Sequence, residues 1–269
     1  MSEAAAVPES GEELITERRG SVRWVVFNRP HARNALTWNM YSRLLEVCDA
    51  VNDERDVRAM VLTGAGGKAF VAGTDISQFR EFKTPQDALD YEARGNLVMN
   101  TLESVRVPTI AAIAGPCTGA GAAIAACCDL RIASPSARYG IPIARTLGNC
   151  LSMQNYTRAA ALIGFARLKD LMMRARLMDA GEMLAAGLLS EVTADEESLP
   201  SRAQLLAEEV GANAPLTLWA TKEALRRVRN QLIPEGSDSD LILSCYTSRD
   251  FQEGVEAFLA KRKPVWKGE

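Results

Sequence analysis

The sequence predicts an α/β fold with a core of buried, largely parallel strands. Short apolar runs at residues 57–64, 107–115 and 130–134 are typical of strands that are buried on both faces. Segments with apolar residues at helical spacing separate these runs, as expected when helices connect parallel strands. After about residue 157 the pattern becomes helical, which indicates a helical C-terminal region added to the α/β core.

The first elements follow from local signals. Residues 14–19 and 22–27 predict two short strands that form a hairpin around Gly20. Thr37 is expected to cap a helix that continues to about Asn52, because the apolar residues after it recur at helical spacing.

The later elements are mostly helices. A helix is expected over about residues 84–102, with Thr84 and Pro85 as its cap and first turn. A shorter helix over about 120–127 precedes the strand at 130–134. The C-terminal segments with helical spacing are 157–175, 179–188, 201–213, 216–228 and 248–263.

The composition is that of a globular protein without a strong charge bias. Of 269 residues, 47% are hydrophobic and 24% are charged, and the formal net charge is −3. This charge gives no general attraction to nucleic acid or to an anionic membrane, so neither is expected as a partner. The acidic N-terminus lacks the features of a secretory or mitochondrial leader. We therefore expect a cytoplasmic protein with a short disordered tail at residues 1–13.

The sequence gives little support for a metal site or for a catalytic triad of the nucleophile–histidine type. The six cysteines form no C-x-x-C pair, and His31 is the single histidine of the chain, so no metal site is expected. A nucleophile–histidine triad would have to use His31, which follows Pro30 in a polar stretch typical of a surface loop. Cys127 and Cys128 lie in an apolar run, where free cysteine behaves as a small core residue.

Two glycine-rich loops, at residues 63–76 and 115–121, each follow an apolar strand. The first is not a phosphate-binding Walker loop, because Ala69 follows Lys68 where Ser or Thr is required, and it lacks the dinucleotide-binding fingerprint. Either loop alone is most simply explained as a tight turn with close helix packing. Facing each other, the two loops could direct two backbone N–H groups at one oxygen and form an oxyanion hole.

Taken together, these stretches resemble the crotonase superfamily, the enoyl-CoA hydratases and isomerases. The resemblance rests on "KAFVAGTDISQF" (68–79), "VPTIAAIAGPCTGAGAAIAACCDLRIAS" (107–134) and "ARYGIP" (137–142). It continues in "RPHARNALT", "DAGEMLAAGLLSEV" and "FQEGVEAFLAKRKPVW", so it covers nearly the whole chain beyond the tail. It implies a spiral of ββα turns that carries the site over residues 14–200, and a helical trimerisation region over 201–269. The implied assembly is a homotrimer or a dimer of trimers.

The resemblance also implies an acyl-CoA thioester as substrate, with coenzyme A as part of that substrate and no permanently bound cofactor. The thioester oxygen would gain charge and be held by the backbone N–H groups of Thr74 and Ala120. The family pattern places the substrate, including its CoA portion, against Arg29, Ala69, Phe70, Ala72, Gly73, Asp75, Ile76, Gly119, Phe258 and Lys261. Asp75 is expected to bond loop backbone as well, and Arg29 and Lys261 are equally well explained as solvated surface charges.

Two residues of the family hydratases are missing from the pattern. The resembling hydratases carry two glutamates for general acid–base addition of water, and this chain has Ala123 and Ile143 at the matching positions. Hydration by the standard mechanism is therefore in doubt. Decarboxylation, isomerisation and thioester hydrolysis remain open, as does a catalytically silent CoA-binding subunit.

The altered loop after Ile143 offers substitutes, although each is also explained as a structural polar residue. Arg145 could hold a substrate carboxylate, because guanidinium binds carboxylates with two parallel hydrogen bonds. Cys150 could act as a nucleophile or an acid, and Asn149 and Ser152 come from the same loop.

Overall fold

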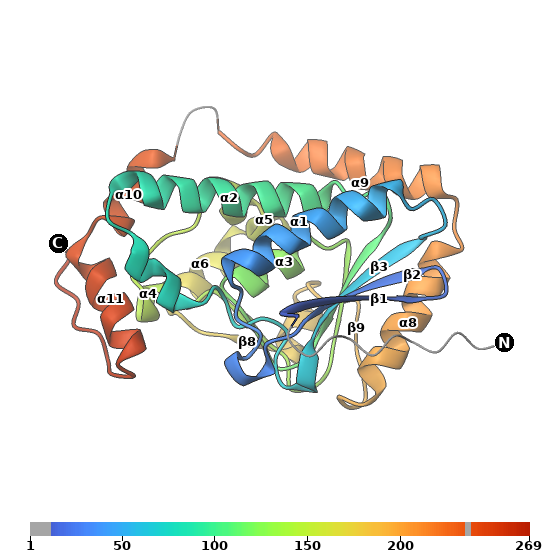
Figure 1. The fold of residues 1–269 in the computed structure, drawn as a ribbon, viewed down its shortest axis with the longest axis horizontal. Helices are drawn as coiled ribbons and strands as arrows, with labels where there is room; N and C mark the ends of the chain where they lie inside the picture. The colour runs from blue at the N-terminus through green and yellow to red at the C-terminus, as the bar shows by residue number, and fades with distance from the viewer. Residues whose placement is uncertain (1–11, 235–237) are drawn as a thin grey trace.

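The computed structural model describes residues 12–234 and 238–269. Figure 1 shows a twisted sheet flanked by helices, with the C-terminal helices α10 and α11 at the end of the molecule away from α8. Most of the expected tail, residues 1–11, lies outside the described residues. Glu13 is held in place, because its carbonyl accepts from the Asn28 N–H at 2.7 Å and its carboxylate pairs with Arg29 at 3.1 Å.

The larger sheet has the strand order β1-β2-β3-β4-β6-β9. Strands β1 and β2 are antiparallel, and every later neighbouring pair in this sheet is parallel. Its strands are β1 Leu14–Arg19, β2 Val22–Phe27, β3 Ala59–Gly64, β4 Thr109–Ile113, β6 Leu130–Ala133 and β9 Glu191–Val192. A smaller sheet of order β5-β7-β8 consists of β5 Pro116–Thr118, β7 Arg138–Gly140 and β8 Met178–Asp179.

The helices lie between and around these strands. The α-helices are α1 Trp38–Asp53, α2 Pro85–Glu103, α3 Ala120–Cys127, α4 Ile143–Thr146, α5 Met153–Ile163, α6 Phe165–Met173, α7 Ala180–Ala185, α8 Ser198–Gly211, α9 Pro215–Asn230, α10 Ser239–Tyr246 and α11 Arg249–Leu259. Three 3-10 turns are η1 Pro30–Ala32, η2 Ala65–Gly67 and η3 Ile76–Glu81. Within the described part of the chain, no helix is long and apolar enough to cross a bilayer.

The N-terminal elements confirm the sequence-based predictions. The hairpin forms over the predicted residues, with Gly20 in the left-handed region at φ 60°. Thr37 caps α1 by accepting from the Met40 N–H at 3.3 Å. Thr84 and Asp87 form a capping box at the start of α2, each side chain accepting from the other residue's N–H.

Three differences appear further along the chain. The helix expected over 157–175 begins already at Met153, because Ser152 caps it, and it breaks at Gly164, which adopts φ 78°. Helix α10 was not predicted. The expected division after residue 200 falls inside α8, whose buried residues Leu199 and Ala203 pack in one cluster with Trp24 of the sheet.

Three apolar clusters hold these layers together. The largest lies between the sheet and α1, α2 and α3, and a second lies under α8 on the opposite face of the sheet (Figure 1). The third packs α10 and α11 against η3 and α2, through buried residues such as Phe79, Tyr246 and Phe251. This third cluster is where the C-terminal helices reach the candidate site.

Helix α3 approaches the loop before η3 so closely that only glycine fits at one position. A methyl group on Gly121 would lie 2.1 Å from the carbonyl oxygen of Val71, which is backbone and cannot swing aside. The contact fixes the spacing between the two glycine-rich loops.

We expect Gly121→Ala to lower the free energy of unfolding by about 1–3 kcal/mol, because overpacking against backbone outweighs the gain in helix propensity. The measurement is urea denaturation followed by circular dichroism. Gly181→Ala in α7 is the matched control, since its added methyl group meets only a side-chain oxygen at 3.4 Å. A Gly121→Ala protein as stable as this control would contradict the packing argument.

Candidate active site

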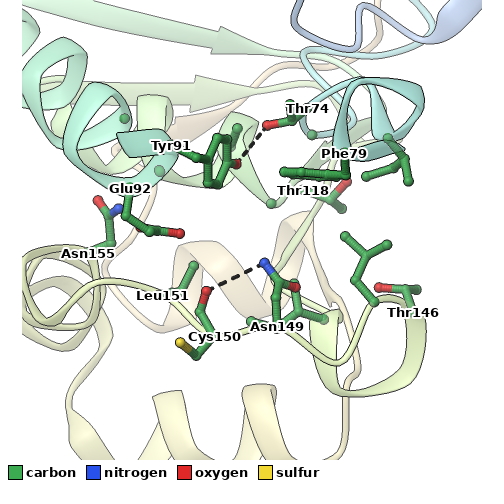
Figure 2. Close-up of a pocket in the computed structure, with 18 of the residues that line it drawn as sticks. Thr74, Phe79, Tyr91, Glu92, Thr118, Thr146, Asn149, Cys150, Leu151 and Asn155 are labelled. Carbon is green, nitrogen blue, oxygen red and sulfur yellow. Dashed lines mark hydrogen bonds between the residues drawn. The ribbon is translucent and has the colours of Figure 1, made fainter. Parts of the chain in front are cut away.

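A cavity of about 170 Å³ lies between α2, α3, the loop before η3 and the segment 142–151. Figure 2 shows 18 of its lining residues, which come from segments far apart in the sequence. Helix α10 contributes Tyr246 and helix α11 contributes Phe258. Among the described residues that line the cavity, none is lysine, arginine or histidine, and Glu92 is the only aspartate or glutamate.

The two glycine-rich loops meet on one wall of this cavity. The Val71 carbonyl accepts from the Thr118 N–H at 3.0 Å, and Val71 forms an isolated parallel bridge with Cys117. Beyond this link Gly73 and Gly119 face each other, since a methyl group on Gly119 would lie 3.4 Å from the Gly73 Cα. Both glycines adopt positive φ angles, 107° and 56°, which residues with side chains rarely adopt. The sequence analysis considered what these loops could do if they faced each other, and the structure brings them into contact.

The residues that directly follow the two glycines present backbone N–H groups at the cavity. Ala120 is the first residue of α3, so its N–H has no partner inside the helix, and Gly119 offers no side-chain cap. For the N–H groups of Thr74 and Ala120, no acceptor is found within residues 12–234 and 238–269. Both residues line the cavity. Two such donors on one wall can stabilise negative charge that develops on a bound carbonyl oxygen.

The Thr74 side-chain hydroxyl is hydrogen-bonded to two tyrosines, so only the backbone N–H of Thr74 is available as a donor to a bound oxygen. The threonine hydroxyl lies 2.8 Å from the Tyr41 hydroxyl. It also lies 3.1 Å from the Tyr91 hydroxyl (Figure 2). Burial raises the pKa of Tyr41 to about 12 and raises the pKa of Tyr91 well above its ordinary value. Both phenols are therefore neutral at physiological pH and serve to position the threonine.

Glu92 was missed by the sequence analysis. It lies on α2, is 7% exposed, and its carboxylate extends into the cavity (Figure 2). Burial raises its pKa from 4.5 to about 7, and the nearby Asp238 carboxylate adds to this. Hydrogen bonds from Tyr246 and from the Ser152 backbone act in the opposite direction. A sequence signal existed, because Glu92 is spaced helically with the buried Ala88 and Met99 on the apolar face of α2.

A chain of hydrogen bonds connects Glu92 to the opposite wall. The Tyr246 hydroxyl donates to the Glu92 carboxylate at 2.6 Å, and the Asn149 side-chain amide donates to the Tyr246 oxygen at 3.0 Å. The Asn149 Oδ1 atom is buried and has no hydrogen-bond partner among the described residues. Asn149, which the sequence analysis named as a candidate catalytic residue, thus lines the cavity as one member of this series of hydrogen bonds.

Cys150 and Ser152 have different surroundings. Cys150 lines the cavity, and its thiol donates to the Leu241 carbonyl at 3.5 Å. Burial raises the pKa of this thiol far above its ordinary value, which keeps it protonated and weakly nucleophilic. Ser152 is fully buried, caps α5 and donates to the Asn96 side chain at 2.7 Å.

Several predicted contact residues lie outside the cavity. Arg29 donates to the Ala35 carbonyl at 2.7 Å and pairs with Asp75 at 3.0 Å, while Asp75 also accepts from the Ser77 N–H, as expected for a loop-bonding residue. Arg145 on α4 and Lys261 after α11 are exposed.

Ala69 and Phe70 are buried in the first loop, where the Ala69 carbonyl accepts from the Asn34 side chain at 2.9 Å. The predicted residues that the structure does bring to the cavity, besides the donors and Asn149 and Cys150, are Ala72, Gly73, Ile76, Gly119 and Phe258. Ala123 and Ile143, where the resemblance places the hydratase glutamates, also line it.

Comparison with known proteins agrees with this architecture. A sequence model of the family described as enoyl-CoA hydratase/isomerase matches residues 17–269. The chain belongs to the enoyl-CoA hydratase/isomerase family. The resemblance to crotonases and the α/β fold expected from it are thereby confirmed.

Its relatives within the family carry more than one activity in their names. A short-chain-enoyl-CoA hydratase of Clostridium acetobutylicum is 34% identical over 252 residues, which are 93% of this chain and 95% of the relative. A crotonyl-CoA hydratase of Syntrophomonas wolfei is 32% identical over 94% of this chain and 96% of its own. Among solved structures, a methylmalonyl-CoA decarboxylase in complex with 2-nitronate-propionyl-CoA has a TM-score of 0.87 at 25% identity, covering 96% of this chain and 99% of that chain.

The pKa of Glu92 predicts a pH-dependent cost in stability. Since the folded chain binds the Glu92 proton more tightly than the unfolded chain, the wild-type protein should lose stability as pH rises from about 4.5 to about 7. The Glu92→Gln variant keeps a neutral acceptor for the Tyr246 hydroxyl. Its stability should not fall over this pH range, because glutamine does not ionise. The difference in free energy of unfolding should grow to about 3 kcal/mol in favour of the variant. Urea denaturation between about pH 5 and pH 8 measures it; parallel pH profiles would contradict the assignment.

Proposed function

We propose that this protein processes an acyl-CoA thioester by stabilising its enolate. The observation that carries the proposal is the contact between the Gly73 and Gly119 loops, which leaves the N–H groups of Thr74 and Ala120 free at one cavity wall. The thioester oxygen would accept from both groups as it gains charge. Such preorganised donors in a water-poor site contribute strongly to catalysis.

The cavity suits a short, uncharged acyl group. Its volume of about 170 Å³ is below the roughly 300–1,000 Å³ of pockets that enclose drug-sized ligands, so it would hold the acyl end of the thioester only. The lining is mostly apolar and aromatic, and it offers no cation among the described residues. The nucleotide end would extend past the half-exposed Phe258 toward Lys261.

The reaction beyond enolate formation is less closely defined by the relatives. Two of them are named hydratases, but at the positions where the resemblance places hydratase glutamates this cavity has Ala123 and Ile143. Decarboxylation is suggested by one structural neighbour, but no described lining residue is a cation that could hold a substrate carboxylate, and Arg145 is exposed outside the cavity. We therefore favour proton transfer at an acyl carbon over hydration and decarboxylation. The rival hypothesis is a catalytically silent CoA-binding protein.

We further propose that the chain forms the trimer of the family pattern. In the single chain, apolar side chains of α9 are exposed, including Leu216 at 80% and Val228 at 68%. Exposed apolar faces of this kind support burial in an oligomer.

The first test is incubation with crotonyl-CoA in deuterated water, with products read by mass spectrometry. We expect deuterium in the terminal methyl group of recovered thioester, because loss of a proton from that carbon gives a dienolate whose charge lies on the thioester oxygen. Formation of 3-hydroxybutyryl-CoA would instead show that water is added without the standard glutamates. Binding of crotonyl-CoA with neither change would favour the silent CoA-binding protein.

Thr74→Pro should abolish turnover, because proline has no N–H to offer the thioester oxygen. Loss of one oxyanion-hole donor costs about 100-fold or more in rate. Thr74→Ala is the matched control, since it removes the hydroxyl but keeps the N–H, and it should stay within about tenfold of wild type. Deuterium incorporation, with circular dichroism to verify folding, measures both; equal rates for the two variants would contradict the oxyanion assignment.

Gly95→Val should block the acyl group without affecting CoA. Gly95 lies on α2 at the cavity, and a Cβ there would meet nothing within 4 Å, so the added side chain would occupy cavity space. We expect the Kd for crotonyl-CoA to rise about tenfold or more, while the Kd for free CoA stays unchanged. Isothermal titration calorimetry distinguishes the two ligands; an unchanged crotonyl-CoA Kd would place the acyl group elsewhere.

A further inference from the structure

We propose that Glu92 is the acid–base group of this site, removing a proton from an acyl carbon next to the thioester carbonyl and returning it. The inference rests on the proposed function and assigns the proton-transfer role that Ala123 and Ile143 cannot perform. It is carried by position: Glu92 is the only carboxyl among the described cavity-lining residues, and it points into the cavity (Figure 2).

The other ionisable groups of the cavity are unsuited to this role. Tyr41, Tyr91 and Tyr246 are buried phenols whose pKa values are raised, and the Cys150 thiol is likewise raised by burial. All four stay protonated at neutral pH. Glu92, with a pKa of about 7, is available in both its charged and its neutral form, which an acid–base catalyst requires.

Tyr246 of α10 and Asn149 of the facing loop position the Glu92 carboxyl group. The Tyr246 hydroxyl donates to one carboxylate oxygen at 2.6 Å and itself accepts from the Asn149 amide at 3.0 Å. The Ser152 backbone also hydrogen-bonds to the carboxylate, and the carboxyl group still points into the cavity (Figure 2). Tyr246 does not itself transfer a proton in this scheme and is a positioning residue. Helix α10 thus influences the proton transfer through the hydrogen bond from Tyr246 to Glu92.

The proton step balances without any further reactant. The Glu92 carboxylate takes a proton from the acyl carbon, forming an O–H bond as the C–H bond breaks. The C–H electron pair forms the enolate double bond, and the carbonyl π pair moves to the oxygen held by the Thr74 and Ala120 N–H groups. If the Glu92 O–H exchanges its proton with water before the return step, return to the same carbon replaces its hydrogen with one from solvent. Return to a carbon two bonds away instead moves the double bond.

The dependence on pH involves the charged or titratable groups that face Glu92 within the described part of the chain. These groups are Tyr91 on its own helix, Tyr41 on α1, Cys150 in the facing loop, Tyr156 on α5, and Asp238 and Tyr246 at the two ends of α10. The phenols and the thiol stay neutral, and Asp238 raises the pKa of Glu92. Since the base must be ionised, exchange should rise with pH to a plateau, with its midpoint near the Glu92 pKa of about 7.

The test measures deuterium uptake into 3-butenoyl-CoA in deuterated water, whose protons next to the carbonyl are doubly activated. We expect Glu92→Gln to lose at least about 100-fold in exchange rate while still binding butyryl-CoA with an unchanged Kd. Glu92→Asp should recover part of the rate, since it keeps a carboxylate. Asp90→Asn is the matched control, because Asp90 is an exposed carboxylate on the same helix.

The Tyr246→Phe variant tests whether Tyr246 positions the Glu92 carboxyl or only supports the packing of α10. Removing its hydrogen bond should raise the pKa of Glu92, so the midpoint of the exchange profile should move upward by about 0.5–1 pH unit. A lower plateau without a moved midpoint would assign Tyr246 a structural role only and would contradict its role in positioning the Glu92 carboxyl.

The outcomes separate this inference from the proposed function. Exchange by Glu92→Gln within about threefold of wild type, with Thr74→Pro inactive, would overturn the role of Glu92 and leave the oxyanion hole standing. Wild-type rates in both variants would overturn the proposed function itself. Binding of the thioester by wild type without any exchange would also overturn the role of Glu92.

Discussion

The site depends on one close contact, the approach of the Gly73 loop to the Gly119 loop. No side chain separates the two backbones there, because both positions carry glycine with positive φ. The Val71–Thr118 hydrogen bond and the tight seat of Gly121 under Val71 fix the spacing. Parallel strands β3 and β4 deliver the chain to this point from the same edge of the sheet. The core of the sheet therefore determines where the N–H groups of Thr74 and Ala120 lie.

The second half of the site comes from the C-terminal helices. Tyr246 of α10 packs with Phe251 of α11 and Tyr91 of α2, with ring centroids 4.9 and 6.0 Å away. The same phenol donates to Glu92. Packing and hydrogen bonding at one residue thus tie the position of α10 to the ionisation of the carboxyl. A C-terminal region that sequence alone suggested for assembly also contributes to the cavity.

The sequence predicted the fold well because its signals are local. The hairpin at 14–27, the Thr37 and Thr84 caps and the helix beginning at Ala120 all follow from spacing and turn chemistry. The family resemblance placed Thr74 and Ala120 at the site, and both line the cavity. Arg145 illustrates the limit: its place in an altered loop suggested the cavity, yet a one-turn helix directs it to solvent. Glu92 is the converse case, since its burial arises only when α10 and the 149–152 loop close over α2.

Burial of Glu92 opposes stability and is best explained by function. A carboxyl on the apolar face of a helix loses hydration, and the Tyr246 hydrogen bond offsets this only in part, since the pKa remains raised. Glutamine at this position would fill nearly the same volume and accept the same bond without the cost of ionisation. A packing role alone would therefore be met at least as well by a neutral side chain. A carboxyl with a raised pKa in a cavity is the pattern expected where a proton must be taken and returned near neutral pH.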